Sequence, residues 1–504
     1  MPIPAKRPAP AALASQPVDL LVVGGGITGA GILRQAAAMG LKAVLVEKQD
    51  FAWGTSSRSS KMVHGGLRYI AQGDVRLTRE SLLERERLLN ELPELVQRHT
   101  YLFPARKGQF PGRWPMTALL WLYDRLAGIR DHRWVPKAEL LRRVPGLKSD
   151  DLSGAMSYTD ALTDDCRLVL RTLHEACDEG AQVCNYLSAE KIRADGEGFA
   201  VTLKDTLDGS EHVLKAGRVI NATGAWADRL SGESARVRPL RGSHLFVSAE
   251  RLPVKDCLTI LHPRDKRPVF IFPWEGLTCI GTTDLDHRDD PDREPRASSE
   301  EVSYLLEMIN SQFPNSHLKP ADIISTMAGV RPVIASGKGV DPSKERRDHA
   351  VWVKDGVVTV SGGKLTTFRI IALDALHAAG LIDESGLRRA KRDRSAMYRH
   401  TLDAPAGLGA PLAALPDGQQ LLGQLQWVLD NEMVVHLDDL LLRRTRIGNL
   451  ISNGGRNQLP EWQALICSAL EWDEARWQRE LTRYGEIIDQ YYSVPPGLME
   501  DQAA

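Results

Sequence analysis

A chain of 504 residues can bury a large core and, at about 100 to 200 residues per domain, is expected to divide into two to four units. Hydrophobic residues make up 43% and charged residues 26%, with 64 Lys and Arg against 65 Asp and Glu, which is typical of a soluble globular protein. Because no basic excess or tract is available to neutralise phosphates, we expect no nucleic-acid partner. The six cysteines form no C-x-x-C pair and no zinc spacing, so we expect packing residues in a reducing compartment and no metal site.

The first 17 residues are rich in Pro and Ala and lack the apolar stretch of a signal peptide, so residues 1–17 are expected to be a disordered leader. No apolar run reaches the roughly 18 residues of a spanning helix. The segment 114–126, WPMTALLWLYDRL, has aromatic residues with arginines nearby, as an interfacial membrane helix would. A helix packed on the protein's own core is the equally supported alternative.

Residues 18–46 are predicted to form a strand, a tight turn, a helix and a second, parallel strand. Gly24, Gly26 and Gly29 follow the first strand in a GxGxxG arrangement and open the helix. Glycine at these places permits a tight turn, close approach of a pyrophosphate and close packing of helix on strand. Glu47, at the end of the second strand, would accept hydrogen bonds from a ribose and repel a 2′-phosphate, which disfavours NADP. We therefore predict a dinucleotide site; a glycine-rich structural turn is the alternative.

The glycine motif alone does not distinguish FAD from NAD. Its place near the chain start, followed by Ser/Thr-rich and glycine-rich segments instead of further βαβ units, favours a buried FAD. Ser56, Ser57, Ser59, Ser60 and Lys61 in the next loop offer hydroxyls and a positive charge to a flavin and its phosphates. A solvated loop is the alternative interpretation.

The rest of the chain reads as a mixed α/β body followed by helices. A solvent-facing amphipathic helix is predicted over 77–95. Two Asp-Gly pairs between strand-like runs predict hairpins, at Asp208-Gly209 and Asp355-Gly356. Further strands are expected over 218–222, 269–274 and 278–283. After about residue 385 the pattern is helical and contains Trp462, Trp472 and Trp477, which predicts a separate helical domain.

Several longer motifs follow one another between about residues 18 and 380: VVGGGITGAGI, TSSRSSKMVHGGLRY, VINATGAW, RGSH, GVRP and SGGKLTTFR. Together they resemble the motifs of FAD-dependent glycerol-3-phosphate dehydrogenases of the aerobic, quinone-linked type. The resemblance implies an α/β (α+β) fold with a Rossmann-like FAD-binding domain of the glutathione-reductase type, an inserted mixed-sheet substrate domain and a helical C-terminal domain. We place these domains at 18–80, 150–235 and 325–384 (FAD-binding), 81–149 and 236–324 (substrate), and 385–504 (helical). Thr28, Phe51 to Gly54 and Arg58 depart from the family pattern.

The same resemblance, with the glycine motif, assigns the FAD contacts. The predicted cofactor-binding residues are Gly24, Gly26, Ile27, Thr28, Gly29, Glu47, Lys48, Thr55, Ser56, Ser57, Ser60, Lys61, His64, Gly65, Gly66, Ala222, Thr223, Gly224, Gly362, Gly363, Lys364, Leu365 and Thr366.

A phosphorylated three-carbon substrate requires cations, and arginine suits phosphate oxygens best. The resemblance implies that the substrate-binding residues are Arg68, Tyr69, His244, Arg331, Arg347 and Lys364, with Arg346 as the alternative to Arg347. The catalytic candidates are His64, His244, Arg331 and Lys364. Either histidine could remove the C2 hydroxyl proton, Arg331 could polarise that hydroxyl, and Lys364 could stabilise reduced flavin. Taken singly, each arginine could be a surface residue, His64 a loop histidine and Lys364 part of a structural turn.

The function implied is oxidation of sn-glycerol 3-phosphate to dihydroxyacetone phosphate by hydride transfer to flavin N5, with electrons passed to a membrane quinone. We therefore expect a cytoplasmic protein attached peripherally to the inner face of the cytoplasmic membrane, with a homodimer as a candidate assembly. One alternative is an oxidase that passes electrons to oxygen. Others are an enzyme for another small hydroxy or amino acid, and a flavin-binding protein without turnover.

Overall fold

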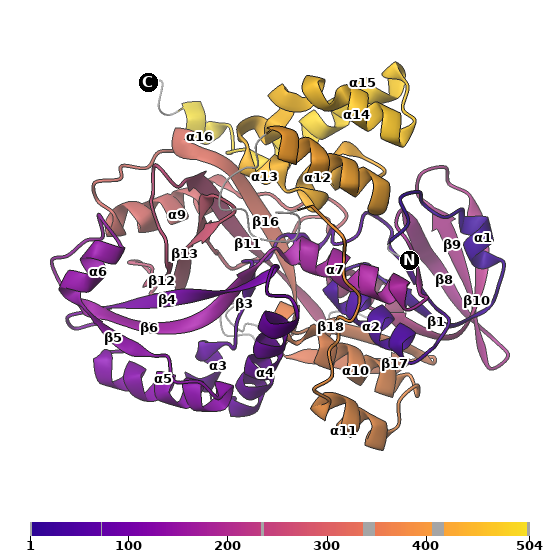
Figure 1. The fold of residues 1–504 in the computed structure, drawn as a ribbon, viewed down its shortest axis with the longest axis horizontal. Coiled ribbons are helices and arrows are strands. Elements are labelled where there is room, and N and C mark those ends of the chain that lie inside the picture. Colours follow the sequence, from indigo (N-terminus) through magenta and orange to yellow (C-terminus); the bar gives the residue numbers. More distant parts are fainter. Residues whose placement is uncertain (1–2, 72, 233–235, 336–347, 406–417, 501–504) are drawn as a thin grey trace.

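The computed structural model describes residues 3–71, 73–232, 236–335, 348–405 and 418–500 (Figure 1). Two large sheets form its body, and the first contains the predicted dinucleotide unit. Its strands run in the order β17-β18-β10-β1-β2-β7, with β8 and β9 extending from β10. Their bounds are β1 Val18–Val23, β2 Ala43–Val46, β7 Gln182–Cys184, β8 Leu187–Asp195, β9 Gly198–Asp205, β10 Glu211–Asn221, β17 His349–Lys354 and β18 Val357–Gly362.

The apolar runs of β1 and β2 are continuous because both faces of these strands are covered. Leu20 and Val22 pack on one face with α2 (Ile27–Ala38), α7 (Asp165–Asp178) and α10 (Phe368–Ala378). Leu21 and Val23 pack on the other face with residues of β8, β9 and β10. β1 lies parallel to both β2 and β10, so the predicted strand, helix and parallel strand are confirmed.

Both predicted hairpins are present. The first joins β9 to β10 around Asp208-Gly209, and the second joins β17 to β18 around Asp355-Gly356. Asp355 and Gly356 have φ of 51° and 80°, as a two-residue turn of the type favoured between antiparallel strands requires.

The second sheet has ten strands and is mainly antiparallel. Its main order is β15-β11-β14-β13-β12-β4-β6-β3, with β16 pairing to β11 and β5 to β6. Their bounds are β3 Met62–Val63, β4 Val96–Arg106, β5 Arg133–Pro136, β6 Leu152–Thr163, β11 Val237–Ser248, β12 Cys257–Leu261, β13 Pro268–Trp274, β14 Leu277–Gly281, β15 Leu285–Asp286 and β16 Ile323–Ile334. β6 and β16, which the predicted limits assign to the FAD-binding domain, pair with β4 and β11 in the second sheet.

Helices cover this sheet on its outer sides (Figure 1). They are α3 Leu67–Ala71, α4 Val75–Glu91, α5 Arg113–Ala127, α6 Lys137–Arg143 and α9 Ser299–Gln312. The short α8 (Ala227–Ser231) follows β10 and contacts β10 and β18 of the first sheet. The helix predicted over 77–95 is α4, but it is not simply solvent-facing. Its Glu84 is buried against Arg369 of α10, and its buried Arg85 pairs with Asp160 of β6.

The expectation of a disordered leader is wrong for the described residues 3–17. They contain α1 (Pro10–Ala14), and Ile3 is only 1% exposed. Arg7 donates to the carbonyl oxygen of Asn185 and to Asp205, both at 2.7 Å. These bonds and the burial of Ile3 attach the segment to the first sheet.

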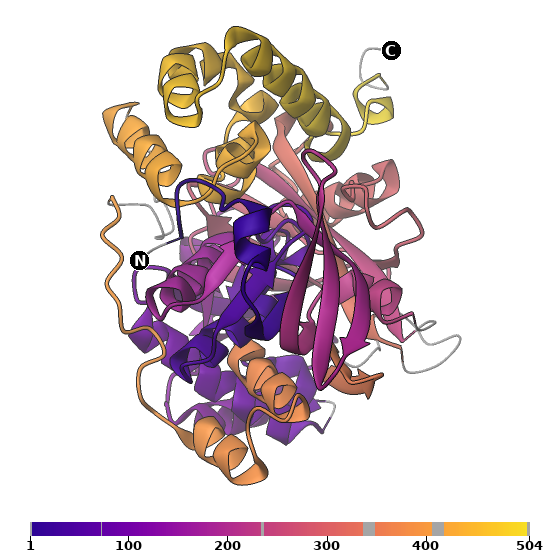
Figure 2. The same cartoon turned by 90° about the vertical axis from the view of Figure 1, so that its right-hand side faces the viewer.

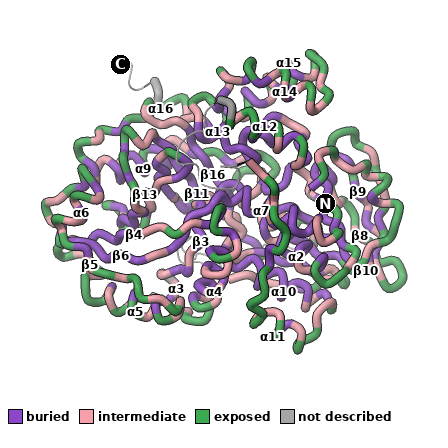
Figure 3. The backbone as a smooth tube through the Cα atoms, in the orientation of Figure 1, coloured by how far each residue is buried: buried purple, intermediate pink, exposed green. Residues whose placement is uncertain are grey.

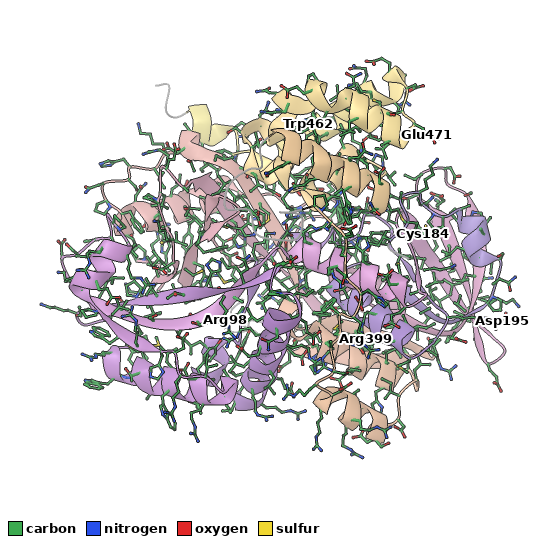
Figure 4. The ribbon with its side chains drawn as sticks, in the orientation of Figure 1. Arg98, Cys184, Asp195, Arg399, Trp462 and Glu471 are labelled. Carbon is green, nitrogen blue, oxygen red and sulfur yellow. The ribbon has the colours of Figure 1, made fainter. Side chains whose placement is uncertain are left out.

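The C-terminal helices form a layer above both sheets in Figure 1, and the orthogonal view in Figure 2 agrees. They are α12 Gly418–Asn431, α13 Ile447–Leu450, α14 Leu459–Leu470, α15 Glu474–Ile487 and α16 Gly497–Glu500. Trp462 lies within this layer (Figure 4), and both Trp462 and Trp477 are buried in its core. The preceding α11 (Glu384–Arg392), where the predicted helical domain begins, lies beside α10 on the opposite side. Figure 3 shows the buried residues concentrated in the sheets and the helices packed on them.

Candidate active site

A cavity of about 1000 Å³ opens where the parallel strands of the first sheet end. Its lining comes from the segments after β1, β2, β10 and β18, together with the loop after Trp53. In open α/β sheets the carboxyl ends of the strands are where ligands bind. The predicted residues that line it are Gly24, Gly26, Ile27, Thr28, Glu47, Lys48, Thr55, Ser56, Ala222, Thr223, Gly224, Gly362, Gly363, Lys364 and Leu365.

The glycine turn has no room for side chains. Gly24 has φ of +112°, and a Cβ there would lie 2.7 Å from the carbonyl oxygen of Ala222. A Cβ on Gly29 would lie 1.8 Å from the carbonyl oxygen of Gly24, because α2 crosses directly against the turn. The helix begins at Ile27, whose N–H donates to the Ser56 hydroxyl at 3.0 Å. This pairs the positive end of the helix with a hydroxyl, as expected for a pyrophosphate site.

Glu47 lies at the end of β2, as the ribose interaction requires. Its two carboxylate oxygens accept hydrogen bonds from the N–H groups of Gly25 at 2.7 Å and Gln49 at 2.9 Å. Burial raises the pKa of this carboxyl. Because it accepts these two hydrogen bonds, Glu47 also holds the glycine turn in place. Neighbouring Lys48 forms an ion pair with Asp292 and lies over the ring of Trp226.

The serine loop contributes to the cavity with only some of its side chains. Thr55, Ser56 and Ser59 line the cavity. Lys61 was predicted to contact the flavin, but its side chain is fully buried and its Nζ donates to Asp165 at 2.7 Å. Since the ammonium is used in this ion pair, the geometry does not support a direct flavin contact for Lys61.

Lys364 lines the cavity next to the HGG segment. Its Nζ lies 2.9 Å from the Ser81 hydroxyl of α4 and 3.7 Å from the centroid of the Tyr69 ring. Burial lowers the pKa of Lys364 to about 7. A Cβ on Gly66 would lie 3.3 Å from this Nζ. The segments predicted around Lys364 and Gly66 are thus adjacent.

His64 and Thr366 are also in direct contact. The His64 N–H donates to the Thr366 hydroxyl at 3.1 Å, and that hydroxyl donates to the His64 carbonyl at 3.2 Å. The next residue, Gly65, donates its N–H to Asp160 at 3.2 Å. These bonds fix the HGG backbone against the start of α10.

His244 and Arg331 lie on paired strands, β11 and β16. The Nε2 of His244 lies 3.0 Å from the Ser60 hydroxyl, and its Nδ1 is buried without a hydrogen-bond partner among the described residues. Burial, together with the charges of Arg331 and Lys61, lowers the pKa of His244 to about 3. The imidazole is therefore neutral at ordinary pH.

The Arg331 guanidinium is held by the segment that follows β14. It donates to the Thr282 hydroxyl at 2.8 Å and to Asp284 at 3.0 Å. The Thr55 hydroxyl donates to the carbonyl of Val330, next to Arg331, so the serine loop reaches both strands that carry these candidates. Arg68 lies in α3, but its side chain, like Arg346 and Arg347, lies outside the described residues.

Sequence reasoning missed the contribution of the C-terminal helices. His436 and Arg483 line the cavity beside Glu47 and Leu187. Nothing in the local pattern around either residue indicates this, because the contact depends on how a distant segment packs.

Comparison with known proteins agrees with this geometry. Residues 19–369 match the family model described as FAD dependent oxidoreductase. The aerobic glycerol-3-phosphate dehydrogenase of Staphylococcus epidermidis is 38% identical over 383 residues, which cover 73% of this chain and 68% of the relative. The solved glycerol-3-phosphate dehydrogenase of Bacillus halodurans, complexed with FAD, superposes with a TM-score of 0.70 and 27% identity over 95% of each chain.

A second solved structure shares the fold. It is the L-alpha-glycerophosphate oxidase of Mycoplasma pneumoniae with FAD bound, with a TM-score of 0.57 and 20% identity over 72% of this chain and 95% of that one. The matched family model, the identity to the staphylococcal relative and the geometry of the glycine turn agree on one assignment. The chain belongs to the FAD-dependent oxidoreductases and, within them, to the family of the aerobic glycerol-3-phosphate dehydrogenases.

Proposed function

We propose that this protein oxidises sn-glycerol 3-phosphate to dihydroxyacetone phosphate. The observation that carries the proposal is that the loop lining the cavity contacts His244 and the carbonyl oxygen of Val330, next to Arg331, while Lys364 lines the same cavity. Bound FAD supplies the hydride acceptor, and the protein supplies orientation and charge. The names of the relatives support glycerol 3-phosphate as the substrate.

The proposed role of each side chain in the site follows from its charge. Arg331 is a permanent cation with fork-like donors, suited to a phosphate or a polarised hydroxyl. Neutral His244 suits the role of base better than a protonated imidazole. Lys364 places positive charge in the cavity where negative charge develops on reduction.

The test is a visible spectrum of the purified protein before and after anaerobic addition of glycerol 3-phosphate. We expect a bound oxidised flavin that bleaches with this substrate and not with glycerol. A flavin that bleaches faster with a phosphate-free hydroxy or amino acid would contradict the substrate assignment. Peroxide formation in air that matches the rate of dye or quinone reduction would identify an oxidase in place of a quinone-linked dehydrogenase.

The proposed acceptor, a membrane quinone, requires contact with the inner face of the cytoplasmic membrane. Among the described helices, none is both long and apolar enough to cross a bilayer. α5 supports peripheral docking, because its Met116 and Leu120 face the core while Trp114 and Trp121 are 74% and 57% exposed. Phe110, just before it, is 80% exposed. Exposed Arg113 and Arg125 lie over the rings of Trp114 and Trp121, a combination suited to an anionic interface.

Sedimentation with vesicles tests this surface. We expect wild-type protein to bind vesicles containing anionic lipid, and the double variant W114S/W121S to bind much less while retaining its flavin. Val213, 57% exposed on β10, provides the control V213S, which should bind as the wild type does. Equal binding by all three proteins would exclude α5 as the docking surface.

A further inference from the structure

Arg446 of the C-terminal region contacts the serine loop next to the cavity, as Tyr492 does through Arg58. Arg446, at the start of α13, is only 3% exposed. Its Nη2 donates to the carbonyl oxygen of Ser57 at 2.8 Å and to Asp165 at 3.0 Å. Its Nη1 donates to the carbonyl of Leu442 within its own region, at 2.9 Å. One side chain therefore joins α13 to the loop and to the start of α7.

Asp165 accepts hydrogen bonds from Arg446 and from the serine loop. Its Oδ2 accepts from the N–H and the hydroxyl of Ser59 at 2.9 and 2.7 Å. Its Oδ1 accepts from Lys61 at 2.7 Å as well as from Arg446, and Lys61 also donates to the Ser57 carbonyl at 2.7 Å. Two cations thus share one buried carboxylate and one carbonyl oxygen.

Both cations lower the pKa of this carboxylate. Burial alone would raise the pKa of Asp165, but Lys61 and Arg446 hold it below its ordinary value. Burial and the charge of Arg446 lower the pKa of Lys61. Removing Arg446 would leave a buried carboxylate with a single cation and the Ser57 carbonyl with one donor fewer.

Arg446 itself adopts a backbone conformation that most residues avoid. Its φ is +64°, in the left-handed region. A residue without glycine's freedom holds this conformation only when its surroundings determine it. Here the surroundings include the contacts of the guanidinium with Ser57, Asp164, Asp165 and the ring of Trp274.

The loop that Arg446 fixes is the one that lines the cavity. Ser59 lines the cavity, and the hydroxyl of Ser60 contacts His244. A shift of Ser57 or Ser59 would therefore displace both the flavin side and the His244 side of the site. The matched family model ends at residue 369, so it does not include this contact.

We propose that the C-terminal helical region is part of the flavin-binding site and that Arg446 is its positioning residue, fixing residues 57–60 for the cofactor. This inference rests on the proposed binding of FAD in the cavity. It differs from a purely structural role, in which Arg446 would only attach one domain to another. Arg167 offers a matched comparison, because it forms a buried ion pair with Glu432 at 2.6 Å between α7 and the same C-terminal region.

The experiment compares R446Q, R446K and R167Q as purified full-length proteins, with FAD as the added ligand and no substrate. For R446Q we expect the dissociation constant of FAD to rise about tenfold, as for a lost hydrogen bond to a charged group. The absorption maxima of its bound flavin should shift, and R446K should restore most of the affinity. R167Q should lose thermal stability while its FAD affinity and flavin spectrum stay as in the wild type.

The inference is overturned if R446Q loses stability like R167Q but keeps wild-type FAD affinity and spectrum. If R446Q does not fold, R446K compared with R167K decides the question by the same two readouts. Bleaching of the wild-type flavin by glycerol 3-phosphate is measured separately, so a wrong substrate would leave this result unaffected.

Discussion

Arg331 is the side chain whose proposed role depends most on substrate charge. Its guanidinium is oriented by Thr282 and Asp284, so it is preorganised before any ligand binds. We expect Arg331→Ala to raise the KM for glycerol 3-phosphate about a hundredfold, as for a lost charge-assisted hydrogen bond, while the flavin absorbance stays unchanged. Steady-state kinetics with a spectrum of each preparation measures both.

Arg267 provides the control for this variant. It also approaches Asp284, at 3.6 Å, but has no bond to Thr282. Arg267→Gln should keep KM within a few-fold of the wild type. Loss of flavin from R331A together with normal kinetics in added FAD would contradict the substrate role.

His244 links the site to the stability of the fold. Its pKa is lowered to about 3 by burial and by the charges of Arg331 and Lys61, from an ordinary value of 6.5. Below pH 6.5 the unfolded chain therefore gains a proton that the folded chain does not, and stability falls as the pH drops toward 3. Between these values His244 should lower the free energy of unfolding by about 1.4 kcal/mol per pH unit.

Urea unfolding at pH 6.5 and pH 5 tests this effect. The stability of H244N should fall less than that of the wild type between the two values, by about 2 kcal/mol. An equal decrease in the free energy of unfolding of the two proteins would mean that His244 is protonated in the folded state at pH 5.

At the scale of elements, the glycine turn and α2 form the tightest contact in the site. Because a Cβ on Gly29 would lie 1.8 Å from backbone, Gly29→Ala should separate α2 from β1. We expect a loss of about 1–3 kcal/mol in the free energy of unfolding, with weaker FAD retention. Gly423→Ala is the control, since a Cβ at this position in α12 meets nothing within 4 Å and alanine favours a helix. Equal stability and FAD content in the two variants would contradict the contact.

The elements that could be predicted from the sequence are those determined by residues close to them in the chain. The β1–α2–β2 unit and both hairpins follow from glycine positions and from apolar runs within about thirty residues. The pairing of β6 and β16 in the second sheet, and the packing of residues 3–17, depend on partners far away in the sequence. The same holds within the site: Lys61 was assigned to the flavin because its partner Asp165 lies more than a hundred residues away and belongs to no motif.

For the whole molecule, buried ion pairs join the C-terminal helices to the dinucleotide-binding sheet. Asp50, on the loop after β2, is fully buried and accepts hydrogen bonds from Arg443 at 2.5 Å and from Arg444 at 2.7 Å. Burial alone would raise the pKa of Asp50, but the two arginines hold it below its ordinary value. Both arginines come from the π-helix Asp439–Arg444, two residues before Arg446. The C-terminal layer is therefore attached where the chain leaves the second strand of the nucleotide fold.

Removing this carboxylate leaves two buried guanidinium groups with fewer acceptors, which costs far more than losing a surface pair. We expect Asp50→Asn to lower the free energy of urea unfolding by about 3–5 kcal/mol. Arg456→Gln breaks the exposed pair of Arg456 with Asp489, at 2.7 Å, and should lower the free energy of unfolding by at most about 1 kcal/mol.

If the C-terminal layer and the sheet form one cooperative unit, D50N will still unfold in one transition, detected alike by tryptophan fluorescence and by far-UV circular dichroism. Two separate transitions in the wild type would mean that the C-terminal helices fold independently of the flavin domain.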